Sequence, residues 1–466
     1  MIVGASAAAS LDGARRMPYW LDDSARPETL DPLTADTRAD LVVVGGGYTG
    51  LWTALRAKER DPGRDVVLLE ATRCGSAASG RNGGFAEPSL THGFANGMSR
   101  WPDEMPALLQ LGIDNLEGIA ETVARHGIDC GLERSGELAV ATREHEVASL
   151  ADEAGQMQAA GLPVRLLDAA AARARVDSPT YLAAMYDPQV VLVEPARLAW
   201  GLRAACLRLG VRIHEGSPVT ALAGEGSRVA VRTAQGVARG GRVVLGTNAS
   251  RPLLRRLRLM SVPVHDYTVV TEPLTDTQRS AIGWSGREGV GDAGNLFHYY
   301  RLTRDGRLLF GGYDAVYHYA SRSGSSAEHR EATYQLLVRH LLQTFPQLEG
   351  VRVEYAWGGV IDTCTRFCCF WGTAMRGRVA YALGFTGLGV AATRFAADTA
   401  LDLVDGLETE RTGLRMVREK PLPFPPEPLR WAGIEATRRS MERADRTGRA
   451  NLWLKTMDKL GLGFDS

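Results

Sequence analysis

A short apolar run that ends in a glycine-rich turn restricts the fold of this chain more than any other feature of its sequence. Residues 40–44 (Asp-Leu-Val-Val-Val) are almost all apolar, and residues 45–50 (Gly-Gly-Gly-Tyr-Thr-Gly) follow directly. Residues 48–60 then have a helical pattern, and residues 66–70 (Val-Val-Leu-Leu-Glu) form a second apolar run. Strands that are buried on both faces of a parallel sheet have this composition. The sequence therefore predicts a β-strand, an α-helix and a second, parallel β-strand in this order.

The glycines of this turn have the dinucleotide-binding spacing G-x-G-x-x-G. Gly45 permits a tight turn, Gly47 lets backbone N–H groups approach a pyrophosphate, and Gly50 lets the helix pack closely on the strand. The helix that follows would direct its positively polarised N-terminus at the phosphates. Glu70 ends the second strand 20 positions after Gly50, where an acidic side chain binds a ribose diol. We therefore expect a dinucleotide to bind here.

The same glycine pattern occurs a second time, at residues 289–294 (Gly-Val-Gly-Asp-Ala-Gly). A chance match is expected in a chain with 52 glycines among 466 residues. Residues 283–288 before it do not resemble a strand, and an aromatic, strand-like segment follows it instead of a helix. We interpret residues 289–294 as a loop that binds no dinucleotide.

Charge and composition narrow the class of protein. Lysine plus arginine and aspartate plus glutamate both number 54, so no net charge attracts nucleic acid or an anionic bilayer, and small-molecule partners are favoured. No apolar run approaches the roughly 18 residues that span a bilayer, and residues 1–10 lack the basic start of a signal peptide. We expect a cytoplasmic globular protein with no integral membrane segment, no nucleic-acid partner and a possible homo-oligomeric state.

Cysteine and lysine are both rare. The six cysteines are too few and too irregularly spaced for a disulfide framework, so we expect reduced thiols. Cys364, Cys368 and Cys369 lie close together, but no histidine or second cysteine pair accompanies them, so no metal site is expected. No lysine occurs between residues 59 and 419.

The residues after Glu70 resemble a known family. Residues 78–84 (Ala-Ser-Gly-Arg-Asn-Gly-Gly) are similar to a segment of the D-amino-acid-oxidase-like FAD-dependent oxidoreductases, and most similar to their γ-glutamylputrescine oxidase and glycine oxidase-like branch. Further similar motifs follow in the family's order within residues 38–405. They are residues 193–195, 247–249, 271–274, 299–302, 357–359 and 384–389.

The resemblance implies an α/β fold, in which a Rossmann-like FAD-binding domain is interleaved with an α+β substrate domain built on a mostly antiparallel sheet. Alternating aromatic segments between residues 262 and 357 fit such a sheet, with one face open to a cleft. An N-terminal arm precedes these domains, and a C-terminal helical tail follows them. The predicted boundaries are 1–39 for the arm; 40–96, 191–255 and 358–410 for the FAD-binding domain; 97–190 and 256–357 for the substrate domain; and 411–466 for the tail.

FAD is the cofactor that the resemblance implies. We expect non-covalent binding, because Trp357 stands where related enzymes carry the cysteine that attaches their flavin. Arg81 and Asn82 offer hydrogen-bond donors, although Arg81 could instead form a structural ion pair. The family's usual histidine in the last motif is Leu388 here, so only the backbone of that loop is expected to act. The expected FAD contacts are Gly45, Gly47, Tyr48, Thr49, Gly50, Glu70, Ala71, Arg73, Ser79, Gly80, Arg81, Asn82, Gly83, Gly84, Val219, Thr247, Asn248, Gly384, Thr386, Gly387, Leu388 and Gly389.

The catalytic candidates come mainly from the aromatic segments. Tyr299 and Arg301 are two residues apart and share one face of a strand, and the resemblance implies that they lie over the flavin. Arg301 could then bind a substrate carboxylate through two hydrogen bonds, with an internal ion pair as the open alternative. Weaker candidates, of residue types that more often pack than catalyse, are His265, Asp266, Tyr267 and Trp357.

The resemblance implies an FAD-dependent amine or amino-acid oxidase or dehydrogenase. Such an enzyme oxidises a C–N bond by hydride transfer to flavin N5, the imine product hydrolyses, and dioxygen or another acceptor takes the electrons. Sarcosine-oxidase-like members use a lysine near the flavin for the reaction with dioxygen, so the absence of lysine from residues 59–419 predicts a slow reaction. The open alternatives are a flavin-dependent 2-hydroxy-acid or polyol dehydrogenase, a nicotinamide-dependent dehydrogenase and a flavin-binding scaffold without turnover.

The tail from residue 411 to residue 466 has apolar positions at roughly helical spacing and an excess of basic over acidic residues. Stripes of this kind usually pack on their own protein. We expect packing within the chain or in a dimer, with binding to a membrane surface as the alternative.

Overall fold

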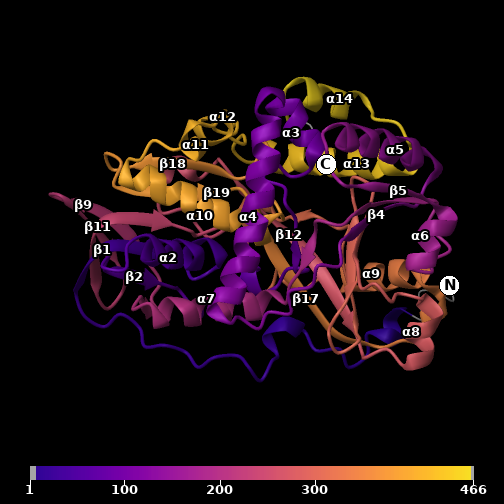
Figure 1. Ribbon diagram of the computed structural model, residues 1–466, viewed down its shortest axis with the longest axis horizontal. Coiled ribbons are helices and arrows are strands. Elements are labelled where there is room, and N and C mark those ends of the chain that lie inside the picture. Colours follow the sequence, from indigo (N-terminus) through magenta and orange to yellow (C-terminus); the bar gives the residue numbers. More distant parts are fainter. Residues whose placement is uncertain (1–6, 463–466) are drawn as a thin grey trace.

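A computed structural model describes residues 7–462 of the chain. Figure 1 shows two halves, each built around a sheet, with α4 (Met105–His126) standing between them. Residues 1–6 of the predicted arm and residues 463–466 of the predicted tail lie outside the described residues. The predicted domain boundaries stay a prediction.

The first sheet contains the predicted strand, helix and strand. β1 and β2 are parallel, with Val44 opposite Leu69, and α2 (Tyr48–Arg60) connects them. Their apolar residues are buried, as expected for central strands of a parallel sheet. The strand order is β18-β19-β11-β1-β2-β8, and β10 and β9 extend it beside β11. The strands are β1 (Thr37–Val44), β2 (Val66–Leu69), β8 (Arg212–His214), β9 (Ala221–Glu225), β10 (Arg228–Arg232), β11 (Val237–Leu245), β18 (Phe370–Ala374) and β19 (Val379–Leu383).

The second sheet is mostly antiparallel, and only its β4 and β13 pair in parallel among the described strands. Its order is β16-β12-β15-β14-β13-β4-β6-β5, with β17 also paired to β12. The strands are β4 (Glu137–Ala141), β5 (Arg165–Asp168), β6 (Ala183–Asp187), β12 (Val262–Thr271), β13 (Gly289–Asp292), β14 (His298–Leu302), β15 (Leu308–Gly312), β16 (Val316–Tyr317) and β17 (Val353–Thr363). A small sheet pairs β3 (Phe85–Ala86) with β7 (Val191–Leu192).

The interpretation of residues 289–294 as a loop is wrong for the first four of them. Gly289–Asp292 form β13, which lies between β14 and β4. A Cβ atom on Gly289 would lie 2.3 Å from the Phe85 ring, so this glycine allows β13 to pack closely against β3 of the small sheet. The first two glycines of the second motif therefore belong to a strand, and no helix follows the motif.

The helices cover both halves. In Figure 1, α2, α7 and α10 lie against the first sheet, and α6, α8 and α9 lie at the outer end of the second. The helices other than α2 and α4 are α3 (Phe94–Arg100), α5 (Glu144–Ala159), α6 (Ala169–Arg175), α7 (Pro195–Arg208), α8 (Asp276–Ile282), α9 (Glu331–Thr344), α10 (Gly389–Asp405), α11 (Glu410–Gly413), α12 (Arg415–Arg418), α13 (Leu429–Thr447) and α14 (Leu452–Lys459).

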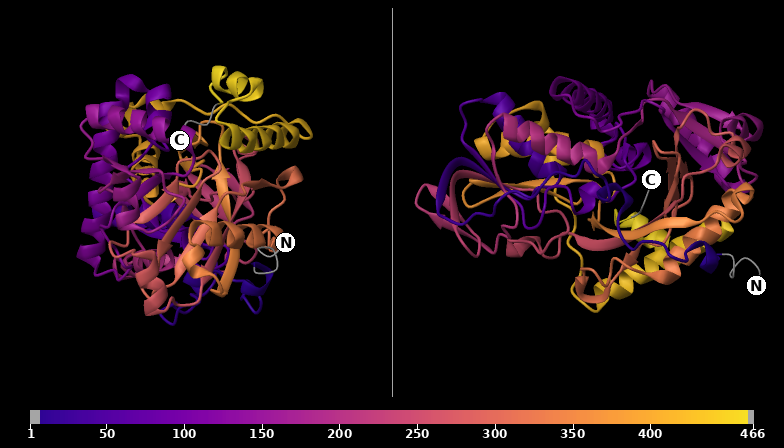
Figure 2. Two further views of the ribbon diagram at one scale, coloured as in Figure 1. Left: turned by 90° about the vertical axis from the view of Figure 1, so that its right-hand side faces the viewer. Right: turned by 90° about the horizontal axis from the view of Figure 1, so that it is seen from below.

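The described parts of the arm and of the tail both contact the body of the protein. In the arm, a short 3₁₀ helix at Tyr19–Leu21 buries Trp20 and Leu21. In the tail, α13 and α14 lie together beside the second half of the molecule, as the two views of Figure 2 show. The described part of the tail contacts its own chain through Arg430 and Asp445, whereas its apolar residues Trp431, Leu452, Trp453 and Leu460 are exposed, so the expected packing is confirmed only in part. None of the described helices has the length and apolar character needed to cross a membrane.

Candidate functional site

The predicted dinucleotide segments meet at one edge of the first sheet. β1, β2 and β11 are parallel neighbours, so the residues that follow their carboxyl ends lie side by side. Gly45 N donates to Leu69 O at 2.8 Å, and Gly246 N donates to Val44 O at 2.9 Å. These bonds connect the first glycine turn to the segments that begin at Glu70 and at Gly246.

The glycines of the turn have different reasons to be glycine. Gly45 has a φ of +108°, and a Cβ atom on it would lie 2.4 Å from Gly246 O. A Cβ on Gly50 would lie 1.8 Å from Gly45 O, so helix and strand could not pack as they do. Gly47 instead faces a cavity, and a Cβ there would meet only Ser79 Oγ, at 3.0 Å. Gly47 thus leaves open the space in which we predict a pyrophosphate to bind.

Glu70 is held in place at the end of β2. One carboxylate oxygen accepts from Gly46 N at 2.6 Å, and the other accepts from Thr72 N at 2.8 Å and from Thr72 Oγ at 3.0 Å. The carboxylate is partly exposed and can accept further hydrogen bonds. Its position is suited to a ribose diol at this edge of the sheet.

A cavity of about 1410 Å³ extends from the glycine turn to the second sheet. Many of the predicted FAD contacts line it: Gly47, Tyr48, Thr49, Ser79, Arg81, Asn82, Gly83, Gly84, Asn248, Thr386, Gly387, Leu388 and Gly389. The other predicted contacts do not line it and lie in the turn, along the strand ends or behind the loops: Gly45, Gly50, Glu70, Ala71, Arg73, Gly80, Val219, Thr247 and Gly384.

Two helix N-termini open onto the cavity. The first residues of α2 and of α10 both line it, and neither helix has a side-chain cap at its own N-cap residue. Tyr48 N donates to Ser79 Oγ at 2.9 Å instead. Helix N-termini attract negative charge through their free N–H groups and the helix dipole. The cavity therefore fits a dinucleotide with two negatively polarised groups: a pyrophosphate at one helix N-terminus and a second electron-rich group at the other.

The loop from Ser79 to Gly84 is tied to the rest of the molecule through its side chains and backbone. Arg81 donates to Glu328 at 2.6 Å and to Ser76 O at 2.9 Å. The structure thus contains the ion pair that was the alternative role for Arg81, although the residue also lines the cavity. Asn82 holds the loop by donating to Ala78 O at 2.9 Å and accepting from Gly84 N at 2.9 Å.

Residues of β12 alternate between the cavity and the core. Asp266 and Thr268 line the cavity, whereas His265 and Tyr267 point to the other side. Tyr267 donates to Ala327 O at 2.7 Å. His265 packs against His318, and burial lowers the pKa of His265 to about 4. The sequence predicted the strand, but the phase of its alternation moves His265 and Tyr267 away from the cavity.

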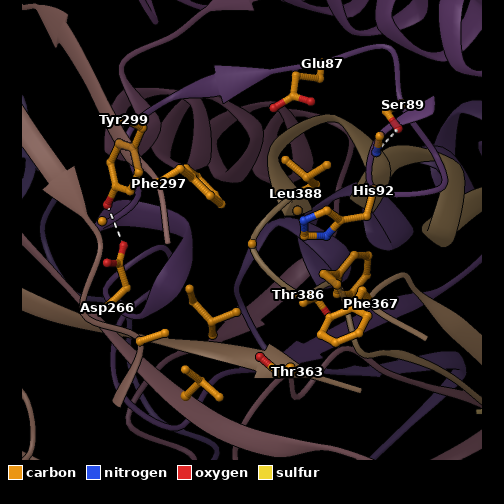
Figure 3. A pocket seen from close by; sticks show the side chains of 18 of the residues that line it. Glu87, Ser89, His92, Asp266, Phe297, Tyr299, Thr363, Phe367, Thr386 and Leu388 are labelled. Carbon is orange, nitrogen blue, oxygen red and sulfur yellow. Dashed lines mark hydrogen bonds between the residues drawn. The ribbon is translucent and has the colours of Figure 1, made fainter. Parts of the chain in front are cut away.

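Tyr299 and Asp266 form a hydrogen-bonded pair on the cavity wall (Figure 3). Tyr299 Oη donates to Asp266 at 2.6 Å and also contacts Thr268 Oγ at 3.0 Å. Burial raises the pKa of Asp266 to about 6, and it raises the pKa of Tyr299 well above its ordinary value. Asp266 therefore changes charge near neutral pH, while Tyr299 remains a neutral donor.

Arg301 and Trp357 occupy other positions than the sequence suggested. Arg301 shares the strand face of Tyr299 but is fully buried outside the cavity lining, where it donates to Val193 O at 2.7 Å. Burial lowers its pKa to about 10. Trp357 is also buried and donates to Arg81 O at 2.9 Å. Among the six catalytic candidates, Tyr299 and Asp266 line the cavity, whereas Arg301 does not line it and is not placed to bind a substrate carboxylate there.

The cavity also has acidic residues that no sequence pattern groups together. Glu87, Glu137 and Asp187 line it from three distant parts of the chain. Burial raises the pKa of all three, that of Glu87 to about 7, and their mutual repulsion adds to the shifts of Glu87 and Glu137.

The arginines of the described lining already have partners: Arg81 pairs with Glu328, Arg438 with Glu435, and Arg430 with hydroxyl and carbonyl oxygens. Burial lowers the pKa of His92 in the same wall to about 4, so that this residue is neutral at pH 7.

Comparison with known proteins gives one family model, two sequence relatives and a solved structure that agree with one another. The family model described as "DAO: FAD dependent oxidoreductase" matches residues 40–403. Gamma-glutamylputrescine oxidoreductase of Escherichia coli (strain K12) is 34% identical over 402 residues, which are 83% of this chain and 88% of that protein. The probable oxidoreductase OrdL of Haemophilus influenzae is 29% identical over 400 residues, with the same two coverages. Glycine oxidase from Geobacillus kaustophilus has a similar fold, with a TM-score of 0.67, 21% identity, and coverage of 80% of this chain and 96% of that chain.

Gly47→Val is expected to abolish FAD binding, because the added side chain fills the space beside Ser79 that the pyrophosphate needs. The measurement is the FAD-to-protein ratio after purification. Gly224→Val is the matched control, since Gly224 lies on the exposed β9 with open space around its Cβ position. Stoichiometric FAD in Gly47→Val would show that the cofactor site is assigned incorrectly.

Arg301→Lys is expected to lower stability by about 1–3 kcal/mol, because a buried donor group loses its fixed geometry toward Val193 O. Thermal unfolding of the FAD-loaded protein measures this loss, and the KM for substrate should stay unchanged. A strongly raised KM at unchanged stability would instead support a carboxylate-binding role for Arg301.

Proposed function

The chain belongs to the DAO family of FAD-dependent oxidoreductases, and from this premise we propose that it oxidises the C–N bond of an amine whose nitrogen binds at Asp266. FAD, when bound, would supply the acceptor for a hydride from the carbon beside that nitrogen, and the imine product would be hydrolysed by water. The observation that carries the proposal is the Asp266–Tyr299 pair in the cavity wall. In Figure 3 this pair lies across the cavity from Thr386 and Leu388 of the predicted flavin loop.

The residues that would hold FAD come from three places. The N-terminus of α2 would bind the pyrophosphate, Glu70 the ribose, and residues 386–389 with the N-terminus of α10 the flavin. No cysteine lines the cavity among the described residues, which supports the expectation of non-covalent binding.

Asp266 would act on the amine through its charge. As a carboxylate it attracts the ammonium form of the substrate and can take a proton from it, which leaves the nitrogen lone pair free. Both groups lose solvent in the cavity, so the pKa of Asp266 rises, that of the ammonium falls, and the proton transfer becomes easier. Tyr299 and Tyr267 N orient the carboxylate by donating to its two oxygens.

The charges of the cavity favour an amine over an amino acid or a 2-hydroxy acid. A substrate carboxylate needs a cation, and every arginine in the described lining already has a partner. Glu87, Glu137 and Asp187 offer oxygen acceptors to an ammonium group, and a bound cation would favour their ionised forms. The name of the Escherichia coli relative, a gamma-glutamylputrescine oxidoreductase, supports an amine as the group that is oxidised.

Asp266→Asn is expected to lower kcat/KM for amines by about 100-fold, because the proton acceptor is lost. In the wild type, kcat/KM should rise with pH through about 6, since Asp266 is ionised above its pKa. Tyr299→Phe should move this inflection to higher pH, because the hydrogen bond from Tyr299 stabilises the carboxylate form. Asp276→Asn on the exposed surface of α8 is the control. An inflection that persists in Asp266→Asn would exclude the proposed role.

Reduced enzyme is expected to react with dioxygen more slowly than relatives that carry a lysine beside the flavin. No lysine lines the cavity in the described part of the chain, and the arginine that lies there near the loop, Arg81, is paired with Glu328. A compact ammonium group stabilises developing superoxide better than a diffuse guanidinium. Stopped-flow mixing of photoreduced enzyme with air-saturated buffer measures the rate. Reoxidation as fast as in lysine-containing relatives would contradict this expectation.

A further inference from the structure

The C-terminal tail contributes directly to the cavity, although it lies beyond the residues 40–403 that match the family model. Figures 1 and 2 show α13 and α14 beside the second half of the molecule. The tail residues that line the cavity are largely apolar and include Leu422, Phe424, Leu429, Ile434, Met441, Trp453 and Met457.

Buried polar contacts fix α13 at both ends. At its C-terminal end, Asp445 is 5% exposed and accepts from Asn295 N at 2.9 Å, Asn295 Nδ2 at 2.5 Å and Leu296 N at 2.9 Å. At its N-terminal end, Arg430 is 8% exposed and donates to Ser321 Oγ at 3.0 Å and to Pro425 O at 3.0 Å. Removing one partner of a buried charged contact is costly, so these contacts hold the helix in one position.

The apolar residues of α13 do not form an ordinary core. Its buried residues are Arg430, Ser440 and Asp445, whereas Ile434 and Met441 are only half-buried. Both of these apolar side chains line the cavity, and so do apolar residues of α4 and α5. A helix that buries its polar anchors and leaves apolar side chains toward a cavity is suited to contact an apolar ligand.

We propose that α13 forms a selectivity wall for the substrate, and that the preferred substrate is an amine with an extended apolar group. This inference rests on the proposed function, because the amine nitrogen is taken to bind at Asp266. The hydrocarbon part of the substrate then extends away from its ammonium group, toward Ile434 and Met441. The ammonium group of such a substrate matches the carboxylates of the cavity, and its hydrocarbon part matches the apolar residues of the same cavity.

The test compares hexylamine with ethylamine on the FAD-loaded, full-length protein. Anaerobic flavin reduction gives kcat/KM for each amine, and the wild type should prefer hexylamine. In the double variant Ile434→Ala, Met441→Ala the ratio of the two values should fall about tenfold, since lost contact with methylene groups has effects of this size. Leu452→Ala is the matched control, because Leu452 is a tail residue that is 81% exposed. An unchanged ratio in the double variant would overturn the proposal.

A second measurement separates this inference from the proposed function. The dissociation constant of hexylamine is read from the change that it causes in the spectrum of oxidised flavin, which needs no turnover. If wild-type enzyme binds hexylamine but is not reduced by it, the proposed function fails, and about tenfold weaker binding to the double variant still supports the selectivity wall. Equal binding to both proteins, or no binding to the wild type, would refute it.

If the double variant does not fold, Met441→Trp provides the same test, because it narrows the cavity without removing apolar contacts that the helix makes. It should reduce kcat/KM for hexylamine more than for ethylamine. Equal effects on the two amines would place Met441 outside the path of the hydrocarbon chain and overturn the proposal.

Discussion

The cavity depends on one loop, Ser79–Gly84, which both halves of the molecule hold in place. From the arm, Trp20 Nε1 donates to Asn82 O at 2.9 Å, and from the second sheet, Trp357 Nε1 donates to Arg81 O at 2.9 Å. Arg81 adds an ion pair to Glu328. The loop thus connects the dinucleotide side of the cavity to the side that carries Asp266 and Tyr299.

Each of these contacts contributes little free energy by itself, but together they hold the loop in one conformation. A hydrogen bond from a buried indole contributes about 0.5–1.5 kcal/mol net, but losing its acceptor leaves a buried N–H without a partner, which costs about 1–3 kcal/mol. Trp20 and Trp357 are 4% and 1% exposed, so neither N–H could turn to water. The loop is therefore fixed before any ligand binds. A fixed loop of this kind positions reacting groups better than a mobile one, because less ordering is required on binding.

The part of the site that could be predicted from the sequence is the part whose geometry is local. A strand, a glycine turn and a helix are contiguous, so Gly45, Gly47 and Gly50 could be interpreted from spacing alone. The phase of β12 could not, because alternation says that Asp266 and Tyr267 face opposite sides but does not say which side is the cavity. The strand at Gly289 was missed for a similar reason, since close packing against Phe85 is a tertiary contact.

Other features could not be predicted because they arise from distant segments. Glu87, Glu137 and Asp187 belong to separate elements, and only the fold brings them to one cavity. The burial of Arg301 depends on the positions of Val193 and Trp20, which no spacing rule gives. The tail showed helical periodicity, but which of its faces meets the cavity follows from the anchors at Arg430 and Asp445.

The resulting cavity has opposite electrostatic preferences at its two sides. The helix N-termini of α2 and α10 favour negative charge, whereas Asp266, once ionised, favours positive charge, and the nearby carboxyl groups offer oxygen acceptors to a cation. A dinucleotide and a cationic substrate can therefore occupy one space without competing for the same groups. In the proposed function, the same separation would draw the amine to the second-sheet side, where Asp266 could pair with it, and would keep anions near the helix ends. A single arrangement of helices and strands can thus select both the cofactor and the substrate by their charges.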